Sequence, residues 1–299
     1  MTAAAVVAIF GPTGVGKTAV AIALARRLRR RGEDPVAVSA DALQVYEGLE
    51  VLTAAPSAGE REALEHRLVG VVPLTESFSA GAYADRAHDE IDSLLEAGRR
   101  PIVVGGTGLY LRAALADLDL RPPPDPARRE RWRRAVQEHG PERVHADLAA
   151  RDPGAARAID PHDRQRIVRA HELLDAGQRP PGGSELWTTQ TRHPTALFGL
   201  IMDRDALAQA IDARVDAMVA AGAAEEVRRA AARGASHTAR KALGFDELLR
   251  GDVDAMKRAT RRYAKRQLTW MGKLPDVRLV DVTRREADDV ADELVDTLA

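Results

Sequence analysis

Short apolar runs alternate with longer amphipathic stretches along the chain. The apolar runs are bounded by glycine, proline or charged residues and predict strands at residues 5–10, 35–39, 68–72, 102–104, 196–202 and 277–282. Between the first four runs, residues 17–31 and 80–97 predict helices. This alternation is typical of a parallel sheet with crossover helices, in which ligands bind at the carboxyl ends of the strands. The predicted fold class is therefore α/β.

The pattern changes in the middle of the chain. Pro122-Pro123-Pro124 ends the preceding element, and no strand-like run follows until after Arg179-Pro180-Pro181-Gly182-Gly183. We therefore predict a mostly helical insertion over residues 122–192, with its proline and glycine borders acting as hinges. Residues 1–121 and 193–299 would then form one core.

Composition excludes several kinds of site. The 299 residues contain no cysteine, which excludes disulfides, thiolate zinc sites and cysteine nucleophiles, and fits a reducing cytosol. The eight histidines show no metal-ligand spacing on a common helix, so no zinc site is predicted. No run approaches the roughly 20 apolar residues that cross a bilayer, and the N-terminal apolar run lacks the basic flank of a signal peptide. We expect a cytoplasmic protein without membrane contact.

The strongest motif is the glycine loop Gly11-Pro12-Thr13-Gly14-Val15-Gly16-Lys17-Thr18. It matches G-x-x-x-x-G-K-[ST] in full, follows a predicted strand and opens a predicted helix, which a plain glycine turn would not require. In such a P-loop, backbone N–H groups point at phosphate oxygens, the lysine supplies a cation and the threonine hydroxyl binds Mg²⁺. The sequence therefore predicts a P-loop core that binds a di- or triphosphate.

Two further loops are expected at the same edge of the sheet. Asp41 follows the second predicted strand and could hold Mg²⁺ through water or accept a proton from a nucleophile, although a helix cap or Asx turn explains it equally well. Gly105-Gly106-Thr107-Gly108 follows the fourth, and its glycines would let the backbone approach a ligand. Taken alone, this segment is best interpreted as an ordinary turn between a strand and a helix. It supports a ligand site only because the other two loops are expected at the same edge of the sheet.

Two stretches are rich in basic residues. Residues 256–273 carry seven lysines and arginines, no acidic residue, and the aromatic residues Tyr263 and Trp270, which could stack on bases of a polyanionic partner. A solvated basic helix face with aromatic residues in the core fits equally well. In the predicted insertion, Gln165 and Arg169 are four residues apart and so lie on one face of a helix. This face could contact phosphates or form salt bridges within the insertion, and the sequence leaves both interpretations open.

Taken together, these residues resemble the bacterial tRNA dimethylallyltransferases, or tRNA isopentenyltransferases, of the IPP transferase family. The glycine loop is shared by many nucleotide enzymes. By contrast, Asp-x-x-Gln-Val-Tyr at 41–46, Gly-Gly-Thr-Gly-Leu-Tyr at 105–110 and Lys-Arg-Gln-x-Thr-Trp at 265–270 are together specific to this family. The segments 163–170, 214–218 and 225–227 also match, so the resemblance spans nearly the whole chain.

The resemblance implies an enzyme that transfers a dimethylallyl group from dimethylallyl diphosphate to N6 of adenosine 37, in tRNAs that read codons beginning with U. It implies Asp41 as general base, with Thr107 and Lys17 also catalytic. Arg214 would join the glycine loop as a diphosphate ligand, with Mg²⁺ on Thr18. The residues expected to contact the tRNA anticodon stem-loop are Asp41, Ala42, Leu43, Gln44, Thr107, Arg129, Gln165, Arg166, Ile167, Val168 and Arg169. A monomer is expected.

The chain departs from the family pattern in three motifs. Ala42 stands where the family has a serine. Leu52 and Ala55 replace the glycine and lysine of Gly-Thr-Ala-Lys-Pro, and Phe245 and Asp246 replace the tyrosine and lysine of Gly-Tyr-Lys-Glu. We hypothesise a working enzyme with altered peripheral contacts.

Three alternatives remain at this level. A small-molecule P-loop kinase explains the three loops but gives no use for the basic stretches. A non-catalytic RNA-binding module leaves Asp41 without a role. An adenylate isopentenyltransferase would not need the insertion.

Overall fold

The computed structural model describes residues 4–121, 125–180 and 185–298. The chain divides into two compact units, one formed by Met1–Asp117 with Thr189–Ala299 and the other by Leu118–Thr188. Both borders lie four residues before those inferred from the sequence. The proposed hinge residues 122–124 and 181–183 are outside the described part of the chain.

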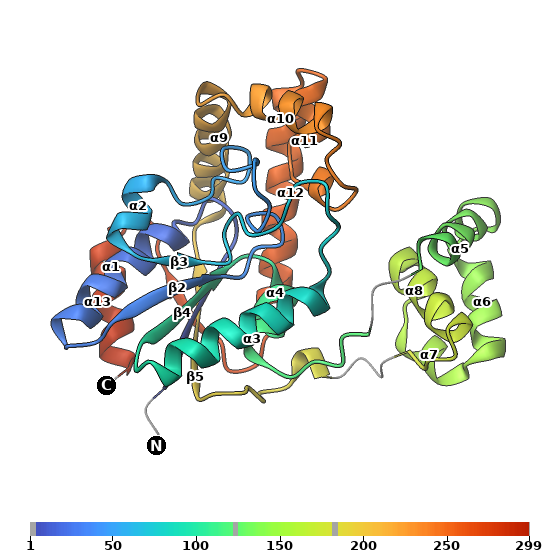
Figure 1. Cartoon of the computed structure of the whole chain (residues 1–299), viewed down its shortest axis with the longest axis horizontal. Helices are drawn as coiled ribbons and strands as arrows, with labels where there is room; N and C mark the ends of the chain where they lie inside the picture. The colour runs from blue at the N-terminus through green and yellow to red at the C-terminus, as the bar shows by residue number, and fades with distance from the viewer. Residues whose placement is uncertain (1–3, 122–124, 181–184, 299) are drawn as a thin grey trace. The chain divides into compact units, whose positions relative to one another are not determined.

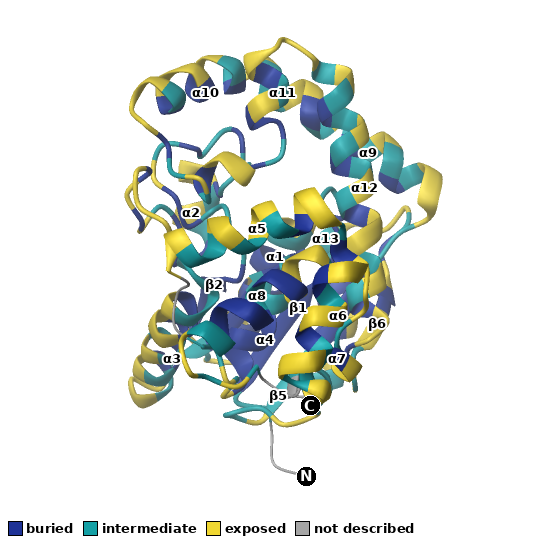
Figure 2. Cartoon of the chain, turned by 90° about the vertical axis from the view of Figure 1, so that its right-hand side faces the viewer, coloured by how far each residue is buried: buried dark blue, intermediate teal, exposed yellow. Residues whose placement is uncertain are grey.

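The first unit is built on a parallel sheet of six strands (Figure 1). These strands are β1 (Val6–Phe10), β2 (Pro35–Ser39), β3 (His66–Arg67), β4 (Arg100–Gly105), β5 (Thr195–Ile201) and β6 (Arg278–Asp281). Their order is β3-β2-β4-β1-β5-β6, and every pairing is parallel. All residues of β1 and β2 are buried (Figure 2), as in sheets that are covered on both faces. The predicted α/β fold with a parallel sheet is confirmed.

One predicted strand is wrong. Residues 68–72 do not form a strand, and β3 consists only of His66 and Arg67 just before them. Leu68 and Gly70 have φ values of 59° and 64°, which take the backbone out of the β region despite the apolar side chains. Val72 keeps a single bridge to Tyr46, so the segment supports the loop that follows β2.

The helices of the first unit cover both faces of the sheet. They are α1 (Lys17–Arg30), α2 (Ala58–Ala63), α3 (Ala80–Glu96), α4 (Gly108–Leu115), α9 (Arg204–Ala220), α10 (Ala223–Ala232), α11 (Phe245–Leu249), α12 (Val253–Met271) and α13 (Ala287–Leu298), with a short 3-10 helix η2 (Ala239–Lys241). The crossover from β1 to β2, through α1, and the crossover from β3 to β4, through α3, run in opposite directions along the sheet. Because such crossovers are right-handed, α1 and α3 lie on opposite faces.

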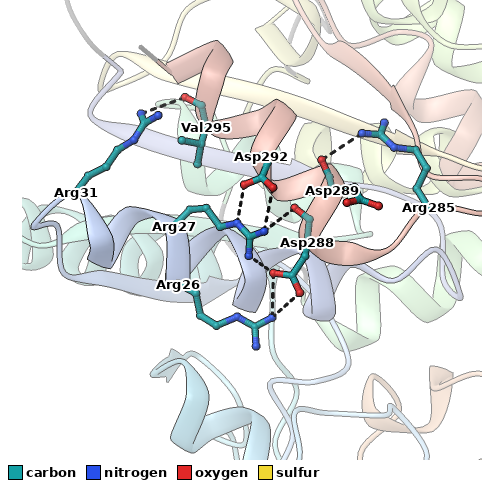
Figure 3. A network of polar contacts seen from close by, with 8 residues as sticks. All are labelled: Arg26, Arg27, Arg31, Arg285, Asp288, Asp289, Asp292 and Val295. Atoms are coloured by element: carbon teal, nitrogen blue, oxygen red, sulfur yellow. Dashed lines mark hydrogen bonds and ion pairs between the residues drawn. The ribbon is translucent and has the colours of Figure 1, made fainter.

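The last helix, α13, is fixed to α1 by arginine–carboxylate contacts (Figure 3). Arg27 of α1 pairs with both Asp288 and Asp292 of α13. Leu28 and Leu294 belong to the same buried apolar cluster beneath these pairs. The C-terminal helix α13 therefore completes the layer of helices that begins with α1, the helix that follows the glycine loop.

The second unit is helical. It contains α5 (Pro126–His139), α6 (Pro141–Arg151), α7 (Pro153–Ala158), α8 (Arg164–Asp175) and the 3-10 helix η1 (Glu185–Trp187). Three of these helices begin with proline, whose fixed φ suits the first helical turn. Trp132 of α5 stacks on the buried His171 of α8 at a ring distance of 3.8 Å. The unit thus has its own small core.

Membrane spans were sought over residues 4–121, 125–180 and 185–298. None of the helices in these ranges is both long and apolar enough to cross a bilayer.

Candidate functional site

A cavity of about 330 Å³ lies at the carboxyl edge of the sheet. The loop after β1 leads to α1, whereas the loop after the neighbouring strand β4 leads to α4, which packs on α3. Adjacent loops that leave toward opposite faces open the crevice in which α/β proteins bind ligands. The loops after β1 and β2 and the last residues of β4 line the cavity, together with residues of α9 and α12.

The glycine loop forms one wall of this cavity. Gly14 and Gly16 have φ values of 85° and 92°, a left-handed conformation that glycine adopts without strain and that turns the chain into α1. The first turn of a helix leaves N–H groups without a carbonyl partner and carries a partial positive charge. The loop therefore presents an anion-binding surface.

Lys17 is the first residue of α1 and points back over the loop. Its ammonium donates hydrogen bonds to the carbonyl oxygens of Gly11 and Pro12, both at 3.0 Å. Burial and the neighbouring positive charge of Arg214 lower the pKa of Lys17 to about 8. A bound anion would favour the charged form of this lysine.

Arg214 of α9 lines the same cavity. Its Nη2 donates to the carbonyl oxygen of Thr53 at 3.5 Å, while its Nε is buried and has no hydrogen-bond partner within the described residues. Burial also lowers the pKa of this guanidinium. A buried donor without a partner beside a second cation is suited to binding a phosphate group.

Asp41 lies in the loop after β2 and faces the cavity. Its Oδ1 accepts hydrogen bonds from the N–H groups of Leu43 at 2.9 Å and Gln44 at 3.4 Å, which is an Asx turn. No group in the described part of the chain donates to its other oxygen, Oδ2. Asp41 can therefore form the Asx turn through Oδ1 and still accept a proton or a ligand at Oδ2, so the two interpretations from the sequence are compatible.

Thr107 joins the loop after β2 to the loop after β4. Its Oγ1 accepts a hydrogen bond from the N–H group of Ala42 at 3.3 Å and lies 3.4 Å from the hydroxyl of Tyr263 in α12. Burial is the main cause that raises the pKa of Tyr263 to about 12, so this phenol stays protonated near neutral pH. Asp41 and Tyr263 thus line the cavity, whereas Thr107 does not line it and contacts the cavity residue Tyr263.

Gln267 is a site residue whose position the sequence pattern did not reveal. Its side chain is buried, donates from Nε2 to the carbonyl oxygen of Gly106 at 2.8 Å and accepts at Oε1 from the N–H group of Thr13 at 2.9 Å. It therefore connects the glycine loop to the loop that carries Thr107. The Lys-Arg-Gln-x-Thr-Trp motif was the available signal, although it did not specify these contacts.

The glycines after β4 lie against helix α12. A Cβ atom at Gly106 would overlap the side chain of Gln267, and one at Gly108 would overlap the Trp270 ring. These glycines therefore admit helix α12 close to the backbone.

The basic stretch of α12 combines both interpretations that the sequence left open. Lys257 and Arg261 pair with Asp216 and Asp212 of α9, each at 2.6 Å, and so tie the two helices together. Arg262 and Lys265 are exposed, and neither has an ion-pair partner among the described residues. The helix therefore presents a partly uncompensated positive face.

The other loop residues predicted to contact tRNA also have contacts within the first unit. Leu43 and Gln44 line the cavity. The Gln44 amide donates to the carbonyl oxygens of Thr53 at 3.4 Å and Ala54 at 3.2 Å. Gln44 thus supports the loop at residues 51–55, which forms another wall of the cavity.

The remaining predicted tRNA residues lie in the second unit. Gln165 and Arg166 are exposed on α8, and Arg129 and Arg169 both pair with the buried Glu172, at 3.5 Å and 3.2 Å. Ile167 and Val168 are buried in the core of this unit. Their side chains therefore cannot contact RNA, because the helix turns them inward.

Potential metal ligands are few. No group of three or more histidine, aspartate or glutamate side chains able to hold a metal ion occurs in the described ranges. The hydroxyl-bearing Thr18 lines the cavity beside Lys17. A metal bound here would need oxygen ligands from a substrate as well.

Known proteins resemble the whole chain. The family model described as IPP transferase matches residues 44–274. Proteins called tRNA dimethylallyltransferase from Rhodospirillum centenum and Thermobifida fusca are 46% and 40% identical, and the alignments cover 89% and 91% of this chain and 87% and 88% of theirs.

Solved structures of similar fold include a tRNA isopentenylpyrophosphate transferase from Bacillus halodurans. It has a TM-score of 0.69 and 33% identity over 98% of this chain and 96% of that one. A eukaryotic dimethylallyltransferase, described as acting on tRNA, has a TM-score of 0.72 and 25% identity over 93% of this chain and 74% of its own.

Proposed function

The chain belongs to the IPP transferase family, and we infer that it transfers a dimethylallyl group from dimethylallyl diphosphate to N6 of adenosine 37 in tRNA, releasing diphosphate. The observation that carries this proposal is the cavity itself. It places two cations, Lys17 and Arg214, beside a carboxylate with one free oxygen, that of Asp41. A diphosphate leaving group and an acceptor amine need these two kinds of group on one site.

Asp41 acts as the general base in this proposal. The exocyclic amine of adenine is a poor nucleophile because its lone pair is delocalised into the ring. As N6 forms its bond to the first carbon of the dimethylallyl group, Oδ2 of Asp41 takes the proton that the nitrogen loses. Oδ1 keeps the loop in place through its bonds to Leu43 and Gln44.

Lys17, Arg214 and the glycine-loop N–H groups stabilise the leaving group. The bond between the allylic carbon and the diphosphate oxygen breaks, and negative charge grows on that oxygen. Fixed donors around it bind this developing charge more strongly than the ground state, which lowers the barrier. The P-loop then serves as a holder of the leaving group and not as a site of ATP hydrolysis.

Mg²⁺ fits this site through oxygen ligands. It is commonly held by one or two protein oxygens together with substrate phosphates and water, and the Thr18 hydroxyl beside the phosphate-binding loop meets that requirement. When bound, the ion would neutralise charge on the diphosphate. Lys17 and Arg214 supply the remaining positive charge.

Recognition of tRNA is proposed for three surfaces. The loop at Asp41 to Gln44 borders the cavity and contacts Thr107, the exposed Arg262 and Lys265 lie on α12, and Arg129, Gln165, Arg166 and Arg169 belong to the helical unit. Adenosine 37 must leave the anticodon-loop stack to reach Asp41 in the cavity, and backbone contacts elsewhere help to offset that cost. The kinase alternative has no use for the basic surfaces on α12 and on the helical unit.

The test is an assay with dimethylallyl diphosphate, Mg²⁺ and an anticodon stem-loop transcript that contains A36-A37-A38. Digestion of the RNA should release N6-dimethylallyl adenosine, and an A37G transcript should give none. Absence of product together with ATP-dependent phosphorylation of a small acceptor would instead support the kinase.

A further inference from the structure

Two neighbouring glutamates at the start of α10 have opposite environments. Glu225 is exposed and pairs with Arg228 on its own helix at 2.8 Å. Glu226 is 6% exposed and turns inward. Its two oxygens accept hydrogen bonds from the backbone N–H groups of Val51 at 2.9 Å and Leu52 at 2.7 Å.

The segment that Glu226 holds is a wall of the proposed diphosphate site. Residues 52–55 line the cavity. Ala54 in this segment has a φ of 43°, a conformation that is unfavourable for a residue with a Cβ atom and that persists only where neighbouring contacts enforce it. Glu226 supplies two of those contacts from outside the cavity, and Gln44 supplies others from inside.

The same segment orients Arg214. The carbonyl oxygen of Thr53, next to Leu52, accepts the hydrogen bond from Nη2 of Arg214 at 3.5 Å. That bond directs a long, flexible guanidinium and leaves its buried Nε without a partner among the residues described. A shift of the segment would therefore move the acceptor on which the arginine rests.

We propose that Glu226 is a positioning residue of the diphosphate site: by fixing the backbone at Val51 and Leu52 it fixes the Thr53 carbonyl and so the Arg214 guanidinium. Glu226 itself does not line the cavity. The identity of the anion rests on the proposed function. The positioning depends only on contacts within the first unit.

A carboxylate suits this position because both of its oxygens can accept hydrogen bonds. A hydrogen bond from a backbone N–H to an ionised acceptor is stronger than one to a neutral acceptor. In Glu226→Gln one oxygen becomes an NH₂ group that faces a backbone N–H, so at least one of the two bonds is lost. Burial raises the pKa of the Glu226 carboxyl, while the two hydrogen bonds from the backbone N–H groups of Val51 and Leu52 favour its charged form.

The experiment measures binding of inorganic diphosphate with Mg²⁺ to the full-length protein by calorimetric titration. We expect Glu226→Gln to weaken binding about tenfold and the matched surface variant Glu225→Gln to change it less than about twofold. In the transfer assay, the KM for dimethylallyl diphosphate should rise while the KM for tRNA stays constant. If Glu226→Gln proves unstable, Glu226→Asp retains the charge and should show an intermediate loss.

A double-mutant cycle separates positioning from general destabilisation. Because Glu226 acts through Arg214, Glu226→Gln should cause no further loss of diphosphate affinity in an Arg214→Ala background. Losses that simply multiply, or an unchanged affinity in Glu226→Gln alone, would overturn the proposal. If the wild type forms no product but the diphosphate titrations behave as expected, the proposed transfer reaction fails and the positioning role stands.

Discussion

At the residue scale, the two oxygens of Asp41 have separate roles, and Asp41→Asn tests the chemical one. Asparagine keeps an oxygen that can accept from Leu43 and Gln44, so the loop should keep its shape. It cannot take a proton from the amine, and we expect the single-turnover rate to fall by a factor of about 10²–10⁴. Binding of tRNA, measured by filter binding, should stay within about twofold of wild type.

The control for this prediction is Asp89→Asn, at an exposed position on α3, which should behave as wild type. If Asp41→Asn lost tRNA affinity as strongly as rate, Asp41 would be a binding residue and not the base.

A second prediction at this scale concerns the pH dependence of Lys17. In the proposed mechanism the charged ammonium binds diphosphate, and the pKa of this group in the free protein is lowered to about 8. As pH rises through that value the free protein loses the charge, so kcat/KM for dimethylallyl diphosphate should fall above about pH 8. Lys17→Met should have low kcat/KM without this inflection.

The stability of the free protein should rise with pH in this range, whereas kcat/KM falls. Burial disfavours the charged form of Lys17, and the unfolded chain holds the proton up to the ordinary pKa of 10.5. Between these two pKa values the unfolded state binds more protons, so this lysine makes folding more favourable as pH rises.

An inflection in kcat/KM that remained in Lys17→Met would assign the pH dependence of kcat/KM to another group.

At the element scale, the packing of α12 against the start of α4 connects structure to site. Gly108 faces the Trp270 ring with no room for a Cβ atom. Gly108→Ala should therefore reduce the free energy of unfolding by about 1–3 kcal/mol, the usual cost of overpacking, as measured by urea denaturation. Activity should fall too, because α12 also carries Tyr263 and Gln267.

Gly272→Ala is the matched control at the end of the same helix. Gly272 has a φ of −64°, and the nearest atoms to an added Cβ lie at 3.8 Å. This variant should unfold like the wild type. Equal stability of the Gly108 and Gly272 variants would contradict the packing argument.

At the scale of the whole molecule, the two units predict separable functions. Among the residues that the structure describes, those lining the cavity all belong to the first unit. The chain leaves and re-enters that unit at neighbouring points, since the N–H group of Arg192 donates to the carbonyl oxygen of Leu115 at 2.8 Å. Residues 118–188 can therefore be replaced by a short glycine–serine linker.

This shortened protein should bind inorganic diphosphate within about threefold of the full chain, because the donors are intact. Its affinity for the anticodon stem-loop should fall about tenfold or more, with a weaker dependence on salt, because arginine contacts to phosphates are lost. Unchanged tRNA affinity would assign recognition to the first unit alone.

Local patterns were sufficient for several of these features. Short-range backbone geometry determines the glycine loop, the position of Lys17 and the start of helix α1. Burial determines the apolar strands. Both kinds of feature could therefore be predicted from the sequence. The segment at 68–72 was apolar enough for a strand, but positive φ values at Leu68 and Gly70 removed it from the sheet. Ile167 and Val168 matched a family segment, yet the helix turns their side chains into the core.

The sequence by itself determined the fold class, the phosphate-binding loop and the family, because these depend on periodicity and on motifs that are contiguous in the chain. Tertiary structure alone decided which oxygen of Asp41 is free, why the glycines after β4 are needed, and how Gln267 and Glu226 hold distant loops. Such contacts join residues up to 254 positions apart, as from Thr13 to Gln267. Local patterns do not encode them, because they arise only when the sheet brings its loops to one edge.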